Sequence, residues 1–265
     1  MFELLGYVAS ILIGISLGLV GGGGSTLAVP VLVYLLHVEP VLATSYSLFI
    51  IGSTSLIGSG QYAIKKLVNF KVALIFGLPS IVTVYVTRAF ILPAIPAVVP
   101  LWGEFELTKA TLIMVLFAGL MLFASVSMIR KSTKEPTPSK ESMGLKTVLV
   151  VLLEGLVVGL LTGLVGAGGG FLIIPALVVF AGLPMKEAVG TSLLIISAKS
   201  LIGFLGDIEN LSIDWTLMLT VSGLAIVGIG IGSFLSTKID GKKLKTGFGW
   251  LILLMGIFIL YSELK

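Results

Sequence analysis

The sequence GLVGGGGSTLAVP fills residues 18–30, and the similar sequence GLVGAGGGFLIIP fills residues 163–175. The offset between them is 145 residues. At this offset, 20 of the 45 residues in 14–58 are identical to their counterparts in 159–203, without a gap. Unrelated stretches of so apolar a chain would match at roughly a tenth of positions. The chain therefore contains a duplicated unit, and each copy carries a run of glycines followed by a proline.

The composition indicates a membrane protein. Of the 265 residues, 57% are hydrophobic and 11% are charged, whereas soluble domains carry roughly 25% charged residues. The net charge of +4 comes from short basic clusters between apolar runs, which is typical of membrane topology signals and not of nucleic-acid binding. The absence of cysteine and the single histidine, His37, exclude disulfides, thiolate sites and a histidine metal site. We expect an all-α polytopic helical bundle in a lipid bilayer, without a cofactor.

The apolar segments predict the membrane spans. Uninterrupted segments cover residues 41–63, 72–95, 108–130, 187–206, 216–237 and 246–261. Each segment is long enough, or nearly so, for one helical crossing, which needs ~20 residues. Each copy opens with a longer apolar segment, 4–36 or 147–181, which the glycines interrupt. Four consecutive glycines, Gly21–Gly24, cost roughly 1 kcal/mol each inside a helix, so we expect both segments to break there.

The distribution of lysines decides how the broken segments cross. The basic cluster 65–71, the polar linker 131–146 and the cluster 238–245 should all lie on the cytoplasmic side. They do so only if each broken segment is a helical hairpin, which also places the acidic loop 207–214 outside. The second copy then lies upside down relative to the first, as in many secondary transporters. The predicted organisation is 1–130 for repeat 1, 131–146 for the cytoplasmic linker and 147–265 for repeat 2.

The glycine breaks are also the candidate binding site. Half-length helices over 24–36 and 170–181 would begin directly after them, with unbonded N–H groups at a positive dipole end. Two such ends would cradle an anion through the amides of Gly23, Gly24, Gly168, Gly169 and Gly170. Hydroxyl donors would come from Ser25, Thr26, Ser47, Thr191 and Ser192. The alternatives are that the glycines only allow close helix crossing and that the hydroxyls only bond nearby carbonyls.

Three charged residues fall within or near the spans. Lys199 lies inside 187–206, where the first copy has Thr54, and it is a candidate for attracting an anion. A salt bridge with Glu154 or an extended side chain reaching towards Asp207 would be a structural explanation. Glu154 could bind a coupling proton or be an interfacial acid. We expect Arg88 to mark the outer end of its span, without a functional role.

Enzymatic function is not indicated by the sequence. The chain has neither a His-Glu-x-x-His motif nor a Gly-x-x-x-x-Gly-Lys phosphate loop. We therefore expect a protein that is not an enzyme and that does not use ATP by itself.

The run 159–177, followed by Ala188 to Leu193, resembles the TauE/SafE sulfite exporter family, and residues 14–48 resemble the same pattern. The likeness covers nearly the whole chain. It implies a multi-pass permease of the cytoplasmic membrane for a small sulfur oxyanion such as sulfite or an organosulfonate. A proton or sodium ion is the expected coupling partner. A channel or carrier for another small ion or metabolite is the alternative function.

Overall fold

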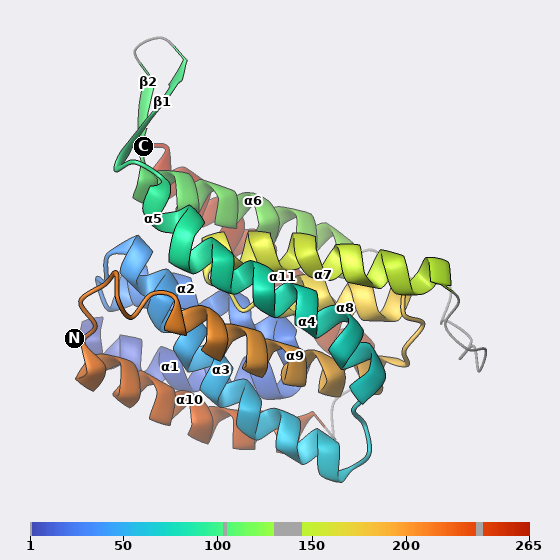
Figure 1. The fold of residues 1–265 in the computed structure, drawn as a ribbon. Coiled ribbons are helices and arrows are strands. Elements are labelled where there is room, and N and C mark those ends of the chain that lie inside the picture. Colours follow the sequence, from blue (N-terminus) through green and yellow to red (C-terminus); the bar gives the residue numbers. More distant parts are fainter. Residues whose placement is uncertain (1, 103–104, 130–144, 237–240) are drawn as a thin grey trace.

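The computed structural model describes residues 2–102, 105–129, 145–236 and 241–265 as a helical bundle (Figure 1). The α-helices are α1 (Phe2–Val20), α2 (Ala28–Pro30), α3 (Pro40–Ile64), α4 (Phe70–Val86), α5 (Leu92–Ala94), α6 (Lys109–Ile129), α7 (Leu145–Val165), α8 (Gly170–Val179), α9 (Met185–Leu205), α10 (Trp215–Leu235) and α11 (Gly241–Glu263). A 3₁₀ helix, η1 (Gly21–Leu27), and two π-helical segments, η2 (Val31–Leu35) and η3 (Thr87–Ile91), connect some of them.

The predicted membrane architecture is confirmed. Within the described ranges, seven helical segments are long and apolar enough to cross a membrane, and α11 adds a shorter apolar stretch over Gly249–Glu263. Large apolar side chains such as Phe123, Leu153 and Leu254 are exposed around the bundle, where lipid would cover them. The strands β1 (Val98–Trp102) and β2 (Phe105–Thr108) form one antiparallel hairpin that projects from the bundle (Figure 1). Most of the predicted linker, 131–146, lies outside the described residues.

Both broken segments are hairpins, as predicted. In the first copy, a Cβ on Gly6 would overlap the side chain of Leu36, so the chain has returned to the level at which α1 begins. Figure 1 shows both termini and the α9–α10 loop at one end of the bundle. The α3–α4 turn and the start of α7 lie at the other end. The basic cluster after α3 is therefore separated from the acidic residues before α10.

Each copy packs its broken hairpin on a helix of the other copy. Helix α1 lies along α10, where a Cβ on Gly14 would overlap the carbonyl of Ala225. Helix α7 lies along α4, where a Cβ on Gly159 would meet the backbone of Ser80 at 2.6 Å. Glycines let the backbones approach this closely. At the 145-residue offset, Gly14 corresponds to Gly159, so the two interfaces use equivalent positions.

The long helices α3 and α9 cross in opposite directions at the centre. Gly52 faces Leu201, and Gly58 lies near Leu193, so one helix ascends as the other descends. The contact is symmetric about the equivalent residues Thr54 and Lys199. Both side chains are fully buried, so the centre of this helix crossing lies inside the bundle.

Equivalent hydrogen bonds join the copies at the two ends of this crossing. The backbone N–H of Asn69 donates to Thr191 Oγ1 at 2.9 Å, and the N–H of Asp214 donates to the Tyr46 hydroxyl at 2.5 Å. Asn69 and Asp214 also cap α4 and α10 through their side chains. The offset relates the two donors to each other and the two acceptors to each other. Tyr46 and Thr191 therefore serve one structural purpose with different side chains.

The tight α1–α10 contact gives a first prediction. A Cβ on Gly228 would overlap the carbonyl of Ile11, whereas Gly230 has open space around the position of its Cβ. We expect Gly228→Leu to destabilise the purified protein by about 1–3 kcal/mol through overpacking, and Gly230→Leu to leave stability unchanged. Thermal unfolding in detergent, followed by tryptophan fluorescence, measures both variants. Equal unfolding midpoints for the two would contradict the packing described.

Candidate functional site

The second glycine run forms a buried turn between α7 and α8. Gly166, Gly168 and Gly169 have φ angles of +71°, +63° and +68°, a left-handed conformation that favours glycine. Gly169 is the N-cap of α8, and its carbonyl accepts the N–H groups of Leu172 and Ile173, both at 3.0 Å. The first N–H groups of α8 therefore point towards the turn, as predicted from the sequence.

The first glycine run has a different conformation from the one predicted. Gly21 is left-handed, with φ of +65°, but a 3₁₀ helix follows it in place of the α-helix expected over 24–36. Ser25 Oγ donates to Gly22 O at 2.8 Å, and Thr26 Oγ1 donates to Gly23 O at 3.3 Å. Bonds back over three residues favour the tighter helix, and the second copy has no hydroxyl at these two positions. The amides of Gly23 and Gly24 thus lie in a 3₁₀ turn and not at an α-helix start.

The two turns meet inside the bundle. A Cβ on Gly170 would overlap the backbone of Gly22, and a Cβ on Gly22 would lie 2.5 Å from the Cα of Gly170. Both glycines are fully surrounded by protein. The predicted convergence of the two broken segments is therefore present, and backbone contacts backbone where they touch.

Lys199 lies against the second turn. Its Nζ donates to Thr162 Oγ1 at 2.8 Å, and the side chain is fully buried. A Cβ on Gly169 would be 2.9 Å from Nζ, so the ammonium group is next to the N-cap of α8. The amino group of Lys199 and the positive end of a helix dipole therefore occupy the same buried place.

Neither structural explanation for Lys199 fits its surroundings. In the part of the chain that the structure describes, the side-chain ion pair is Arg88–Asp207, and Lys199 has no acidic partner. The buried Oε2 of Glu154 has no hydrogen-bond partner among these residues. The Lys199 side chain does not reach Asp207, because Nζ is held by Thr162 on α7. An ammonium without a counter-ion is unfavourable in such a place.

The other predicted donors are engaged elsewhere. Ser47 Oγ donates to the carbonyls of Thr44 and Gly166, beside the second turn. Ser192 Oγ donates at 2.8 Å to the carbonyl three residues back on its own helix. Thr191 Oγ1 accepts the Asn69 N–H at the α9–α4 contact. The structure therefore brings Lys199 to Gly169 and Gly170, and it uses these hydroxyls to hold the turns and helices.

Two residues in this region were not recognised from the sequence. Thr162 stands where the first copy has Leu17, just as Lys199 stands where it has Thr54. The sequence signal for this pair was that the second copy differs from the first by a polar residue at position 162 and a charged residue at position 199. Thr54 Oγ1 donates at 2.6 Å to Ile50 O on its own helix, so the first copy has no equivalent of the Thr162–Lys199 pair.

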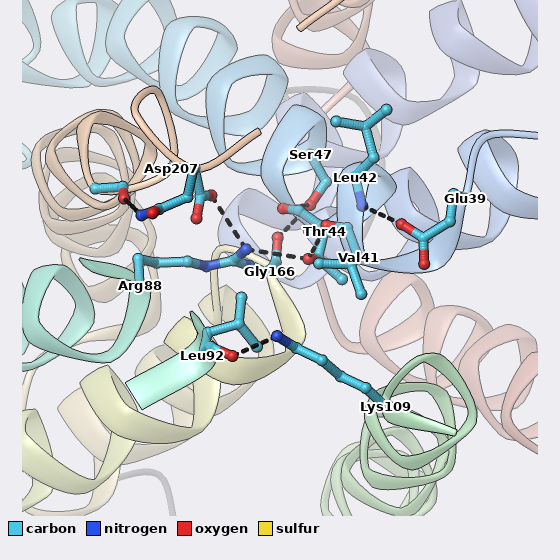
Figure 2. Close-up of polar contacts among 12 residues, drawn as sticks. Glu39, Val41, Leu42, Thr44, Ser47, Arg88, Leu92, Lys109, Gly166 and Asp207 are labelled. Atoms are coloured by element: carbon cyan, nitrogen blue, oxygen red, sulfur yellow. Dashed lines mark hydrogen bonds and ion pairs between the residues drawn. The ribbon is translucent and has the colours of Figure 1, made fainter. Parts of the chain in front are cut away.

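Arg88 is the second such residue: it lies in the last turns of its span, as expected, but its side chain is buried inside the bundle. The side chain is fully buried, and Nη1 lies 3.1 Å from both Asp207 Oδ2 and Thr44 Oγ1 (Figure 2). Burial raises the pKa of Asp207 above its usual range, against the opposing effect of Arg88. The π-helical segment η3 positions Arg88, and sequence periodicity does not predict such a segment. Within the described residues, no group of three or more acidic or histidine side chains could hold a metal.

Comparison with known proteins agrees with this architecture. The family profile described as Sulfite exporter TauE/SafE matches residues 7–259. A "Probable membrane transporter protein" of Xylella fastidiosa is 29% identical over 95% of this chain and 92% of the relative. "Probable membrane transporter protein YunE" of Bacillus subtilis is 26% identical over 97% and 98%, and "Probable membrane transporter protein MJ0441" of Methanocaldococcus jannaschii is 27% identical over 96% and 93%.

No solved structure matches the chain. The family and these relatives are described as transporters and not as enzymes. The family match covers nearly the whole chain and includes both glycine turns. This chain belongs to the TauE/SafE sulfite exporter family and is a multi-pass membrane transporter.

Proposed function

We propose that this chain is a secondary transporter that moves a small sulfur oxyanion, such as sulfite or an organosulfonate, across the cytoplasmic membrane. The observation that carries the proposal is the position of Lys199, buried without an acid at the N-terminus of α8. A buried ammonium without a partner costs several kcal/mol, and the helix dipole adds to that cost. A bound anion would offset both terms.

The donors around Lys199 suit an oxyanion. An ammonium group has three N–H donors, and Thr162 takes one of them. The remaining donors lie next to Gly169, and the amides of Gly168, Gly169 and Gly170 are the backbone donors of the same turn. They fit an anion whose negative charge is spread over several oxygens. The name of the family, which specifies sulfite, supports the same substrate class.

Transport would use an inverted repeat. The opposite directions of α3 and α9, the exchanged α1–α10 and α4–α7 contacts and the matched Asn69 and Asp214 hydrogen bonds support an inverted relation between the copies. In such transporters, access alternates as one repeat rocks against the other around a central site. A proton or sodium ion would provide the driving force. The unpartnered Oε2 of Glu154 is the candidate for binding a proton.

Flux into liposomes tests the proposal. Purified protein reconstituted into liposomes should take up labelled sulfite or methanesulfonate with saturation kinetics, and unlabelled sulfite should compete. A transmembrane pH or sodium gradient should raise the initial rate if that ion is coupled. Non-saturating flux of halide, or flux of a divalent cation without any oxyanion, would replace the proposal with a channel or a cation carrier.

A further inference from the structure

Arg88 has an unused hydrogen-bonding edge inside the protein. Its Nη1 is bonded to Asp207 and Thr44. Its Nε and Nη2 are buried and have no partner among the described residues. These two nitrogens carry parallel N–H groups on one side of the guanidinium, which is the arrangement that binds two oxygens of one anion. A fully buried side chain that offers this edge needs an acceptor.

The ion pair with Asp207 does not account for this edge. Arginine–carboxylate pairs that serve structure are frequently bidentate, whereas Asp207 here takes one nitrogen of Arg88. Ser45, one residue from Thr44 on α3, is a second polar contact of the Asp207 carboxylate. Asp207 is therefore held by groups other than the Nε and Nη2 edge of Arg88, and that edge stays without a partner among the described residues.

Buried charge gives an independent indication. The buried charged side chains of the described chain are Arg88, Lys199 and Asp207. They sum to one positive charge when all are ionised. One monovalent anion would make the interior neutral, and two cationic groups are available to receive it.

Arg88 and Lys199 approach the same end of α7. A Cβ on Gly163 would touch the side chain of Thr87, the neighbour of Arg88, and Lys199 is bonded to the preceding residue, Thr162. Figure 2 shows the guanidinium between Asp207 and Thr44, with Gly166 beside Thr44. Lys199 and Asp207 are eight residues apart in the sequence, about 12 Å of helix rise. Arg88, paired with Asp207, thus lies beyond Lys199 towards the end of the bundle with the acidic loop.

We propose that the Nε and Nη2 edge of Arg88 is a second oxyanion subsite, which the substrate occupies on its way between the Lys199 site and the outer surface. The subsite takes sulfite, sulfonates and other anions with two oxygens in the plane of the fork, and it discriminates against halides, which offer one acceptor atom and cannot place a separate one in line with each N–H group. Asp207 and Thr44 hold the guanidinium in place through Nη1. This inference rests on the proposed function, because it assigns a second position to the same transported anion.

The test compares three proteins in liposomes: wild type, Arg88→Lys and Lys199→Gln. Arg88→Lys keeps the charge and loses the fork. We expect it to raise KM for methanesulfonate by about 10-fold, equivalent to one lost hydrogen bond to a charged group. We also expect it to weaken the preference for methanesulfonate over bromide, measured by competition, by a similar factor. Lys199→Gln reports on the proposed central site independently.

The outcomes separate the two proposals. If wild type transports methanesulfonate and Arg88→Lys shows unchanged KM and unchanged selectivity, Arg88 is structural and the subsite is excluded. If wild type neither binds nor transports an oxyanion, the proposed function fails, and the subsite fails with it. If Lys199→Gln is impaired and Arg88→Lys transports normally, the proposed function stands. Only the second subsite is then excluded.

A second variant covers the case in which Arg88→Lys does not fold. Asp207→Asn keeps a side-chain oxygen that can accept from Nη1, so the guanidinium stays in place, and it removes the negative charge next to the fork. The proposed subsite predicts sulfite binding about 10-fold tighter by calorimetry on the purified variant. An unchanged or weaker Kd in a well-folded Asp207→Asn protein would show that the guanidinium does not bind the anion.

Discussion

Replacement of Lys199 by methionine is expected to make the empty protein more stable and to abolish efficient transport. Substitution of a buried unpaired charge by an apolar side chain of similar length removes its desolvation cost, so stability should rise by about 1–4 kcal/mol. The same change removes a charged donor to the anion, worth about 1.5–3 kcal/mol. The KM for sulfite should therefore rise by about 10- to 100-fold. Thermal unfolding without and with sulfite measures the stability and the loss of anion binding on one sample, and liposome uptake gives KM.

Lys186→Met is the matched control. Lys186 lies on the same helix and is exposed at its start, so its loss should change neither the unfolding temperature nor KM by much. A Lys199→Met protein that is less stable than wild type and is still stabilised by sulfite would contradict the anion site. Lys199 would then be a structural residue held by Thr162.

Gly170→Ala should arrest transport even though it adds one methyl group. The new Cβ would overlap the backbone of Gly22, and backbone on a buried turn cannot move aside as a flexible side chain can. The two turns would have to separate, which would displace the α8 amides from Lys199. We expect the uptake rate to fall by at least about 100-fold, because a small misplacement of binding groups costs that much. Liposome flux measures the loss, and size-exclusion chromatography checks that the variant is folded.

Gly223→Ala is the control for this change. Gly223 lies on α10 with open space around the position of its Cβ, so alanine there should leave uptake unchanged. Normal uptake by Gly170→Ala would mean that the contact between the turns is not needed for transport. The site would then have to be placed away from Gly170.

Much of the architecture could be predicted from the sequence, because hydropathy and duplication are properties of the whole chain. The hairpin form of both broken segments followed from the charge bias around Lys65 and Asp207. The position of Lys199 inside a span was also visible. These inferences depend on averages over long stretches or on counting residues. None of them needs the orientation of a side chain.

The chemistry of the site depended on contacts that the sequence does not carry. Thr162 became the partner of Lys199 only because α7 and α9 both pack on α4, and the burial of Arg88 depends on the π-helical segment that turns it inward. The hydroxyls of Ser25 and Thr26 were expected to serve a ligand, but they shape the first turn instead. Hydroxyl groups bond equally well to a carbonyl or to an anion, so local sequence could not decide between these uses.

The exchanged packing of the hairpins also affects biosynthesis. Helix α1 ends at Val20, and its partner α10 begins at Trp215, about 200 residues later. At typical rates of translation, α1 would remain without this partner for roughly 10–40 s. Helix α7, in contrast, emerges after α4 is complete. The first hairpin must therefore persist in the bilayer, with its glycine face uncovered, until nearly the whole chain has been synthesised.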